Sequence, residues 1–135
     1  MKPRINIITV AVDNLERSLA FYRDGLGWPT EGIVDDADHV AFELKNGLFF
    51  VLYPRTTLAA DAGQPNAAPS SVEFVLSHFV PNREDVDALL KHVESIGGTP
   101  LESMVDQPWG YSRQFKDPDG HIWEIMWHPG FEMED

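Results

Sequence analysis

The stretch INIITVAVDNLERSLAFYRDGLGW, residues 5–28, decides how this chain begins to fold. Its first eight residues are mostly β-branched or apolar, which is typical of a strand buried on both faces. Asp13 is a good N-cap residue, and Glu16 follows it at the spacing of a capping box. Apolar residues then recur at steps of three or four as far as Leu26, where two glycines intervene. The stretch therefore predicts a strand followed by a helix.

The same pattern returns in the second half of the chain. A shift of 68 residues places Val12, Asn14, Glu16 and Ala20 on Val80, Asn82, Glu84 and Ala88. The three short β-type runs expected after the first helix are 28–34, 39–45 and 48–53, and those after the second helix are 100–105, 111–116 and 121–127. The order strand-helix-strand-strand-strand therefore occurs twice. Internal duplication explains this best, and chance similarity of two strand-helix units is the alternative.

Turn and linker residues separate these runs. Asn46-Gly47 predicts a tight hairpin, and Asp117 to Gly120 predicts the last turn. In the second half, a strand over 72–80 precedes a helix with apolar residues over 86–93. The composition over 55–71 shifts to Ala, Pro, Gly, Asp and Thr, which predicts a linker with at most a short helical turn. We therefore expect one domain, 1–135, made of modules over about 4–54 and 72–128.

Composition excludes several classes of function. The chain has 135 residues, enough for a core without metals or disulfides, and its net charge is −12. A chain this acidic would repel the phosphate backbone of a nucleic acid, which argues against nucleic-acid binding. It has no cysteine, so disulfides, zinc-thiolate sites and thiol nucleophiles are excluded. No apolar stretch suggests a membrane span or a signal peptide, and we expect a soluble cytoplasmic protein.

Two stretches carry a family resemblance. ITVAVDNLERSLAFYRDGLGW, residues 8–28, and QFKDPDGHIWEIMWHP, residues 114–129, resemble the vicinal oxygen chelate superfamily of glyoxalases, bleomycin resistance proteins and extradiol dioxygenases. The resemblance implies an α+β fold of two βαβββ modules that form an open, cupped sheet around a cavity. It also implies a homodimer, with pockets often completed by the second chain.

The resemblance implies a metal site as well, because similar proteins hold a divalent metal with side chains from the first and last strand of each module. The corresponding positions here are Ile7, Val51, Val75 and Glu124. Only Glu124 can ligate, and one carboxylate cannot supply the donors that such a metal needs. We therefore expect no metal cofactor. An atypical site that joins Glu124 to Glu73 and a histidine is the disfavoured alternative.

Further residues are predicted to contact a small-molecule ligand. Aromatic side chains on the last strands and on one loop would line an apolar pocket, and two arginines could hold an anionic group or simply pair with carboxylates. With Ile7, Val51 and Val75, the predicted ligand-binding set comprises Phe50, Tyr53, Arg55, Trp109, Tyr111 and Arg113.

Two functional hypotheses follow. The first is a dimeric, metal-free binding protein that encloses a small, largely apolar or aromatic molecule. The second is an enzyme of lyase or dioxygenase type, with Glu124 as a general base or as part of an atypical metal site. Glu124 is thus the candidate catalytic residue; its other interpretation is a retained acidic residue that only bonds its neighbours.

Overall fold

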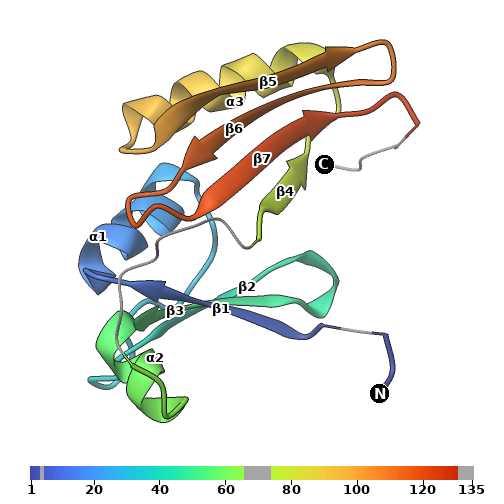
Figure 1. The fold of residues 1–135 in the computed structure, drawn as a ribbon. Coiled ribbons are helices and arrows are strands. Elements are labelled where there is room, and N and C mark those ends of the chain that lie inside the picture. Colours follow the sequence, from blue (N-terminus) through green and yellow to red (C-terminus); the bar gives the residue numbers. More distant parts are fainter. Residues whose placement is uncertain (4, 66–73, 131–135) are drawn as a thin grey trace. The chain divides into compact units, whose positions relative to one another are not determined.

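The computed structural model describes residues 1–3, 5–65 and 74–130, and the chain divides into two compact units, 1–68 and 69–135. Among the described residues there is one sheet of three strands in the first unit and one of four in the second (Figure 1). Helices and strands are mixed in both units, so the α+β class predicted from the sequence is confirmed.

The first unit builds its sheet from β1, β3 and β2, in that order. β1 runs parallel to β3, and β2 is antiparallel to it. Its elements are β1 (Ile7–Val12), α1 (Leu15–Leu19), the π-helix η1 (Ala20–Gly25), β2 (Val40–Glu43), the 3-10 turn η2 (Lys45–Gly47), β3 (Phe49–Pro54) and α2 (Arg55–Asp61).

The first helix begins one residue later in the chain than it would with Asp13 as its N-cap. Asn14 is the N-cap, because its backbone is extended and its Oδ1 accepts a hydrogen bond from the Arg17 amide at 3.0 Å. The prediction of Asp13 as the cap was therefore wrong. Its carboxylate instead accepts a hydrogen bond from Arg55 Nε at 2.9 Å.

The core of the first unit lies between α1–η1 and one face of the sheet. Tyr22 is fully buried, and its ring lies 5.0 Å from that of Phe50 and 6.0 Å from that of Phe42. Trp28 completes the cluster, 5.7 Å from Phe50. The edge-on and tilted ring pairs are the arrangements that aromatic side chains prefer. This packing fixes which side chains of β2 and β3 face the helix.

One further prediction about the first unit was wrong. The strand expected over 28–34 is absent except for a single bridge between Thr30 and Phe42, because Gly27 takes a left-handed φ of 77° and Trp28 turns into the core. The segment expected as a linker over 55–71 begins with the helix α2, which packs on β3 and β1. The end of that segment, and the expected start of the next strand at 72, lie outside the described residues.

The second unit places its strands in the order β4-β7-β6-β5. β4 runs parallel to β7, whereas β7, β6 and β5 are successively antiparallel. Its elements are β4 (Leu76–Phe79), α3 (Arg83–Ser95), β5 (Thr99–Gln107), β6 (Gly110–Lys116) and β7 (Ile122–Trp127). The three strands that follow α3 confirm the predicted runs.

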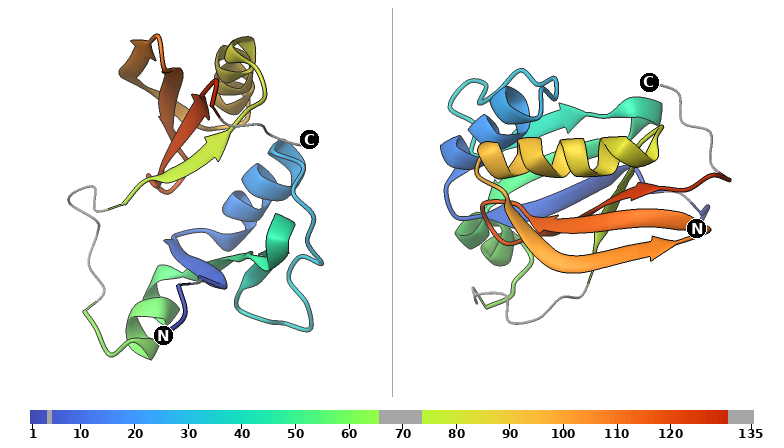
Figure 2. Two further views of the ribbon diagram at one scale, coloured as in Figure 1. Left: turned by 90° about the vertical axis from the view of Figure 1, so that its right-hand side faces the viewer. Right: turned by 90° about the horizontal axis from the view of Figure 1, so that it is seen from above.

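The helix α3 packs on β5, β6 and β7 and lies along one face of this sheet (Figure 2). A reciprocal capping box between Asn82 and Asp85 starts it. Val86, Leu90 and Val93 bury its apolar stripe. No helix in the described segments has both the length and the apolar character needed to cross a membrane.

Candidate functional site

The face of the first sheet that points away from α1 carries a hollow of about 370 Å³. Side chains alternate along a strand, so the residues beside those that enter the core point to this open face. Register places Thr9 of β1 and Ala41 of β2 on either side of Val51. The hollow is lined by Ile7, Thr9, His39, Ala41, Phe49, Val51 and Tyr53.

An aromatic pair stands at one side of this hollow. The ring of His39 is stacked on that of Tyr53, with centroids 4.8 Å apart and planes within 6°. His39 Nδ1 also lies 3.1 Å from the Oδ1 atom of Asp38. The carboxylate and the tyrosine ring both contact the imidazole. The stacked pair presents a flat aromatic surface at the hollow.

A second hollow of about 760 Å³ lies where the loop after η1 passes β2. Thr30 holds this loop against the sheet, since its hydroxyl donates to the Ala41 carbonyl at 2.6 Å and accepts from the Gly32 amide at 3.1 Å. Its lining includes Glu31, Glu43 and Lys45 as well as apolar residues. This hollow is more polar in its residues than the first.

In the second unit, Glu124 is partly buried on the sheet face away from α3. The Ser77 hydroxyl of β4 donates a hydrogen bond to Glu124 Oε1 at 3.1 Å, and Gln114 of β6 lies directly opposite. Chemically, such a carboxylate can accept a proton or hydrogen bonds from a ligand.

The strand registers test the equivalence of Val51 and Glu124. Thr9 and Ser77 stand 68 residues apart, the shift of the internal repeat. Thr9 pairs with Val51, and Ser77 pairs with Glu124. The two residues thus occupy matching positions in the two sheets. Val51 is a hydrocarbon where the second unit has a carboxylate.

The donor set at the four metal-ligand positions does not fit a divalent ion held in the manner that the family resemblance implies. Ile7 and Val51 line the hollow with hydrocarbon, and Val75 is also apolar. Glu124 is the remaining donor of the four. Among the described residues, no group of three or more histidine, aspartate or glutamate side chains is placed to hold a metal. Glu73, part of the alternative site, lies outside the described residues.

Three predicted ligand-binding residues point away from the open faces. Phe50 is 2% exposed and belongs to the core cluster. Tyr111 and Arg113 lie on the α3 side of their sheet. The Tyr111 hydroxyl donates to Asp87 of α3 at 2.8 Å, and Arg113 Nη1 donates to the same carboxylate at 3.3 Å. Because side chains alternate along β3 and β6, these three residues lie on the sheet faces opposite to those of Val51 and Glu124.

The remaining predicted residues are scattered. Arg55 pairs with Asp13 and lies at the start of α2. Val75 precedes β4 and is 39% exposed. Trp109 lies at the tip of the β5–β6 hairpin, is 51% exposed, and its ring centroid is 6.4 Å from that of His128. Of the predicted set, the first hollow brings together Ile7, Val51 and Tyr53.

Sequence reasoning left four lining residues of the first hollow out of the ligand-binding set. They are Thr9, His39, Ala41 and Phe49. Alternation along the hairpin from 39 to 53 could have found His39, Ala41 and Phe49 once Val51 was assigned to the open face. The second hollow was missed for a different reason: the loop beside it was expected to be a strand.

Known proteins share both the sequence pattern and the fold. The model of the Glyoxalase/Bleomycin resistance protein/Dioxygenase superfamily matches residues 4–125. No curated protein matches the chain. A glyoxalase-related enzyme from Fulvimarina pelagi is 26% identical, with 98% of this chain and 93% of that chain covered and a TM-score of 0.84.

Two more solved structures share the fold at lower identity. A lactoylglutathione lyase from Agrobacterium tumefaciens is 22% identical, with 98% of this chain and 100% of that chain covered and a TM-score of 0.70. A glyoxalase/bleomycin resistance protein/dioxygenase family enzyme from Burkholderia phytofirmans PsJN is 14% identical, with coverages of 91% and 97% and a TM-score of 0.77.

Proposed function

Because the chain belongs to the Glyoxalase/Bleomycin resistance protein/Dioxygenase superfamily, we propose that it binds an apolar or aromatic small molecule without the metal ion of its metal-dependent relatives. The observation that carries this proposal is the lining of the first hollow. Ile7 and Val51, whose side chains are hydrocarbon, occupy two of the positions at which the family resemblance implies metal ligands. An apolar wall with a few polar groups is the usual form of a small-molecule site.

The side chains around these two positions support an organic ligand. Phe49 and Tyr53 offer aromatic surface from β3, while Thr9 and His39 offer hydrogen-bonding groups. Ile7 is 56% exposed, an apolar side chain whose burial by a ligand is favourable. A metal ion would find no donor in Ile7 or Val51, whereas an aromatic ring would pack against both.

The proposal is tested with naphthylmethanol, a neutral aromatic probe, by isothermal titration calorimetry. Ala41 is exposed in β2 and lines the hollow, so Ala41→Leu fills space with little strain in the core. Ala88→Leu, on an exposed position of α3, is the matched control. Binding lost in Ala41→Leu and kept in Ala88→Leu supports the proposal. No binding to the wild-type protein, or equal affinities in all three proteins, refutes it.

We also propose that the protein is a homodimer, as the family resemblance implies. Size-exclusion chromatography with light scattering measures this directly. We expect about twice the chain mass of 15.2 kDa. A single-chain mass at all concentrations would remove the dimer from the proposal and leave the ligand site of the first unit to be tested as above.

An enzyme is the second candidate function, and the Ser77–Glu124 hydrogen bond is the observation that favours it. A carboxylate held by a hydroxyl on an open sheet face can act as a general base or as one ligand of an atypical metal site. Metal analysis of protein purified without chelator tests the atypical metal site. One equivalent of tightly held metal that is lost in Glu124→Gln supports the enzyme. Metal below about one-tenth of an equivalent, on the order of background, excludes that site, and probe affinity that is also unchanged in Glu124→Ala then supports the binding protein.

A further inference from the structure

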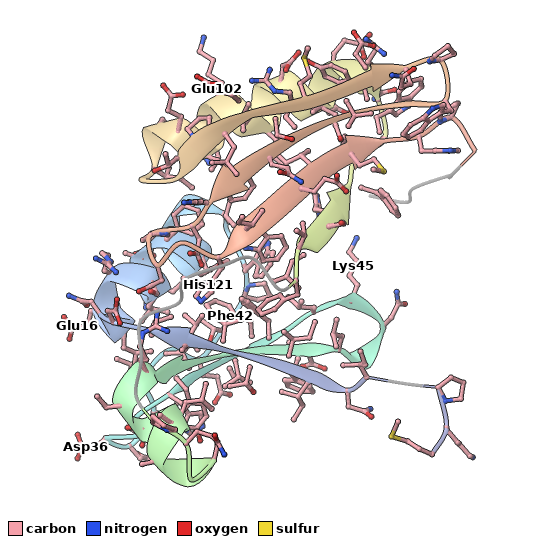
Figure 3. The ribbon with its side chains drawn as sticks, viewed as in Figure 1. Glu16, Asp36, Phe42, Lys45, Glu102 and His121 are labelled. Carbon is pink, nitrogen blue, oxygen red and sulfur yellow. The ribbon has the colours of Figure 1, made fainter. Side chains whose placement is uncertain are left out.

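The turn between β2 and β3 contains the chain's one Asn-Gly pair, Asn46-Gly47. Both residues are exposed, and both have left-handed backbone conformations, with a φ of 66° at Asn46 and 77° at Gly47. The Leu44 amide donates a hydrogen bond to the Leu48 carbonyl at 2.8 Å and closes the turn. Lys45, the residue before the pair, marks this end of the hairpin in Figure 3. The pair thus forms a tight turn at the surface.

The carboxamide of Asn46 lies where it can react with the backbone amide that follows it. Within the described residues, its side chain has no hydrogen-bond partner. A Cβ added at Gly47 would meet no heavy atom within 4 Å, so the space beside the glycine is open. Attack by the Gly47 nitrogen requires rotation about the Asn46 Cα–C bond away from its ψ of 24°. The conformational freedom of glycine and the low free energy at which exposed turns open both permit this rotation.

Two other asparagines, Asn14 and Asn82, have the same side chain in different surroundings. Asn14 Oδ1 accepts a hydrogen bond from the Arg17 amide at 3.0 Å, and Asn82 Nδ2 donates one to Asp85 Oδ2 at 3.1 Å. Both are N-caps, so their carboxamides are held towards a helix. Each is followed by a residue that has a side chain. They therefore lack both features that make the carboxamide in the β2–β3 turn reactive.

We propose that Asn46 is a site of spontaneous covalent modification, with water as the co-reactant. The Gly47 nitrogen forms a bond to Asn46 Cγ, and the side-chain nitrogen leaves as ammonia together with the proton of the attacking amide. Water then opens the resulting succinimide ring. Opening at the side-chain carbonyl gives aspartate, and opening at the main-chain carbonyl gives isoaspartate. Neither step needs an oxidant, a reductant or an enzyme.

The two products change the hairpin in different ways. Both add a negative charge beside Lys45 to a chain whose net charge is already −12. Isoaspartate also leads the main chain through Cβ and Cγ of residue 46, which lengthens the turn by one carbon. Glu43 and Phe49 pair at the end of the hairpin next to this turn. Because turn geometry fixes the register of a hairpin, the isoaspartate product should loosen this pairing, whereas aspartate should keep it.

Ageing of the native full-length protein at mildly alkaline pH tests the proposal. Samples are digested at acid pH, which prevents reaction during handling, and deamidation is followed by peptide mass spectrometry. A protein isoaspartate methyltransferase with labelled S-adenosylmethionine identifies the isoaspartate product. Deamidation of Asn46 should be about tenfold faster than that of Asn14 or Asn82, a barrier lower by about 1.4 kcal/mol. The rate should rise with pH, because the attacking nitrogen must lose its proton.

Two variants serve as controls. Gly47→Ala places a methyl group in open space, and its restricted backbone should slow the reaction by about tenfold. Asn46→Asp carries the charge without the longer main chain, so its Tm should exceed that of the isolated isoaspartate form. Equal rates at the three asparagines, an unchanged rate in Gly47→Ala, or reaction at Asn46 only in urea would overturn the proposal. Equal Tm values would overturn the effect on the hairpin.

Discussion

Phe49 and Phe50 are adjacent on β3, and their side chains lie on opposite faces of the sheet. Phe50 is 2% exposed in the core of the first unit, whereas Phe49 is partly exposed and lines both hollows. Replacing each with alanine removes the same atoms from the same strand. The pair therefore tests directly which face of the sheet is core and which is ligand site.

The magnitude of each effect follows from the surroundings. Phe50 loses ring contacts at 5.0 Å to Tyr22, 5.7 Å to Trp28 and 6.4 Å to Phe42. Truncating a phenylalanine this buried costs about 3–5 kcal/mol, from lost burial and the cavity left behind. Phe49 keeps part of its surface in water, so Phe49→Ala should cost about 1 kcal/mol.

Urea unfolding followed by circular dichroism measures both effects. With a slope of about 2 kcal/mol per molar, Phe50→Ala should lower the midpoint by about 2 M and Phe49→Ala by about 0.5 M. Naphthylmethanol binding should show the reverse order, with loss in Phe49→Ala and retention in folded Phe50→Ala. Equal destabilisation by the two variants, or binding lost only in Phe50→Ala, would refute the assignment of faces.

Three further predictions concern single residues. Asn14→Ala should lower the free energy of unfolding by about 0.5–2 kcal/mol because it removes the N-cap of α1, and Asp13→Ala should lower it less; equal losses in urea unfolding would contradict the cap assignment. Gly98→Ala should cost about 1–3 kcal/mol, since the added Cβ would overlap Val93 Cγ1; an unchanged Tm would contradict this steric assignment. Glu124→Gln should bind naphthylmethanol as tightly as the wild type, because the proposed ligand body lies on the first unit. A large loss of affinity in calorimetry would place Glu124 in the ligand site.

Hydrophobic periodicity and turn residues predicted much of the fold because both are local properties of the sequence. The apolar run 5–12, the hairpin around Asn46-Gly47 and the stripe over 86–93 each follow from neighbouring residues, and the structure has elements at all three. The strand that was wrongly predicted over 28–34 depends instead on contacts between residues that are not neighbours in the sequence. Trp28 suits a strand by composition, but the Tyr22 and Phe50 rings draw it into the core.

The candidate site was harder to predict than the fold for the same reason. Glu124 and Val51 could be matched by counting from turn glycines, and their registers agree. Phe50 and Tyr111 were chosen as aromatic residues near a pocket, without the parity that turns them towards helices. The pairing of Arg113 with Asp87 joins residues of β6 and α3, and no local pattern reveals it.

The most direct test of the central claim, that this chain binds an aromatic molecule without a metal, is the dissociation constant of naphthylmethanol before and after exhaustive treatment with chelator. The hydrocarbon at Ile7 and Val51 predicts the same value in both states, and no change when Mn²⁺, Fe²⁺, Ni²⁺ or Zn²⁺ is added back. Binding that disappears with the chelator and returns with one of these ions would contradict the claim.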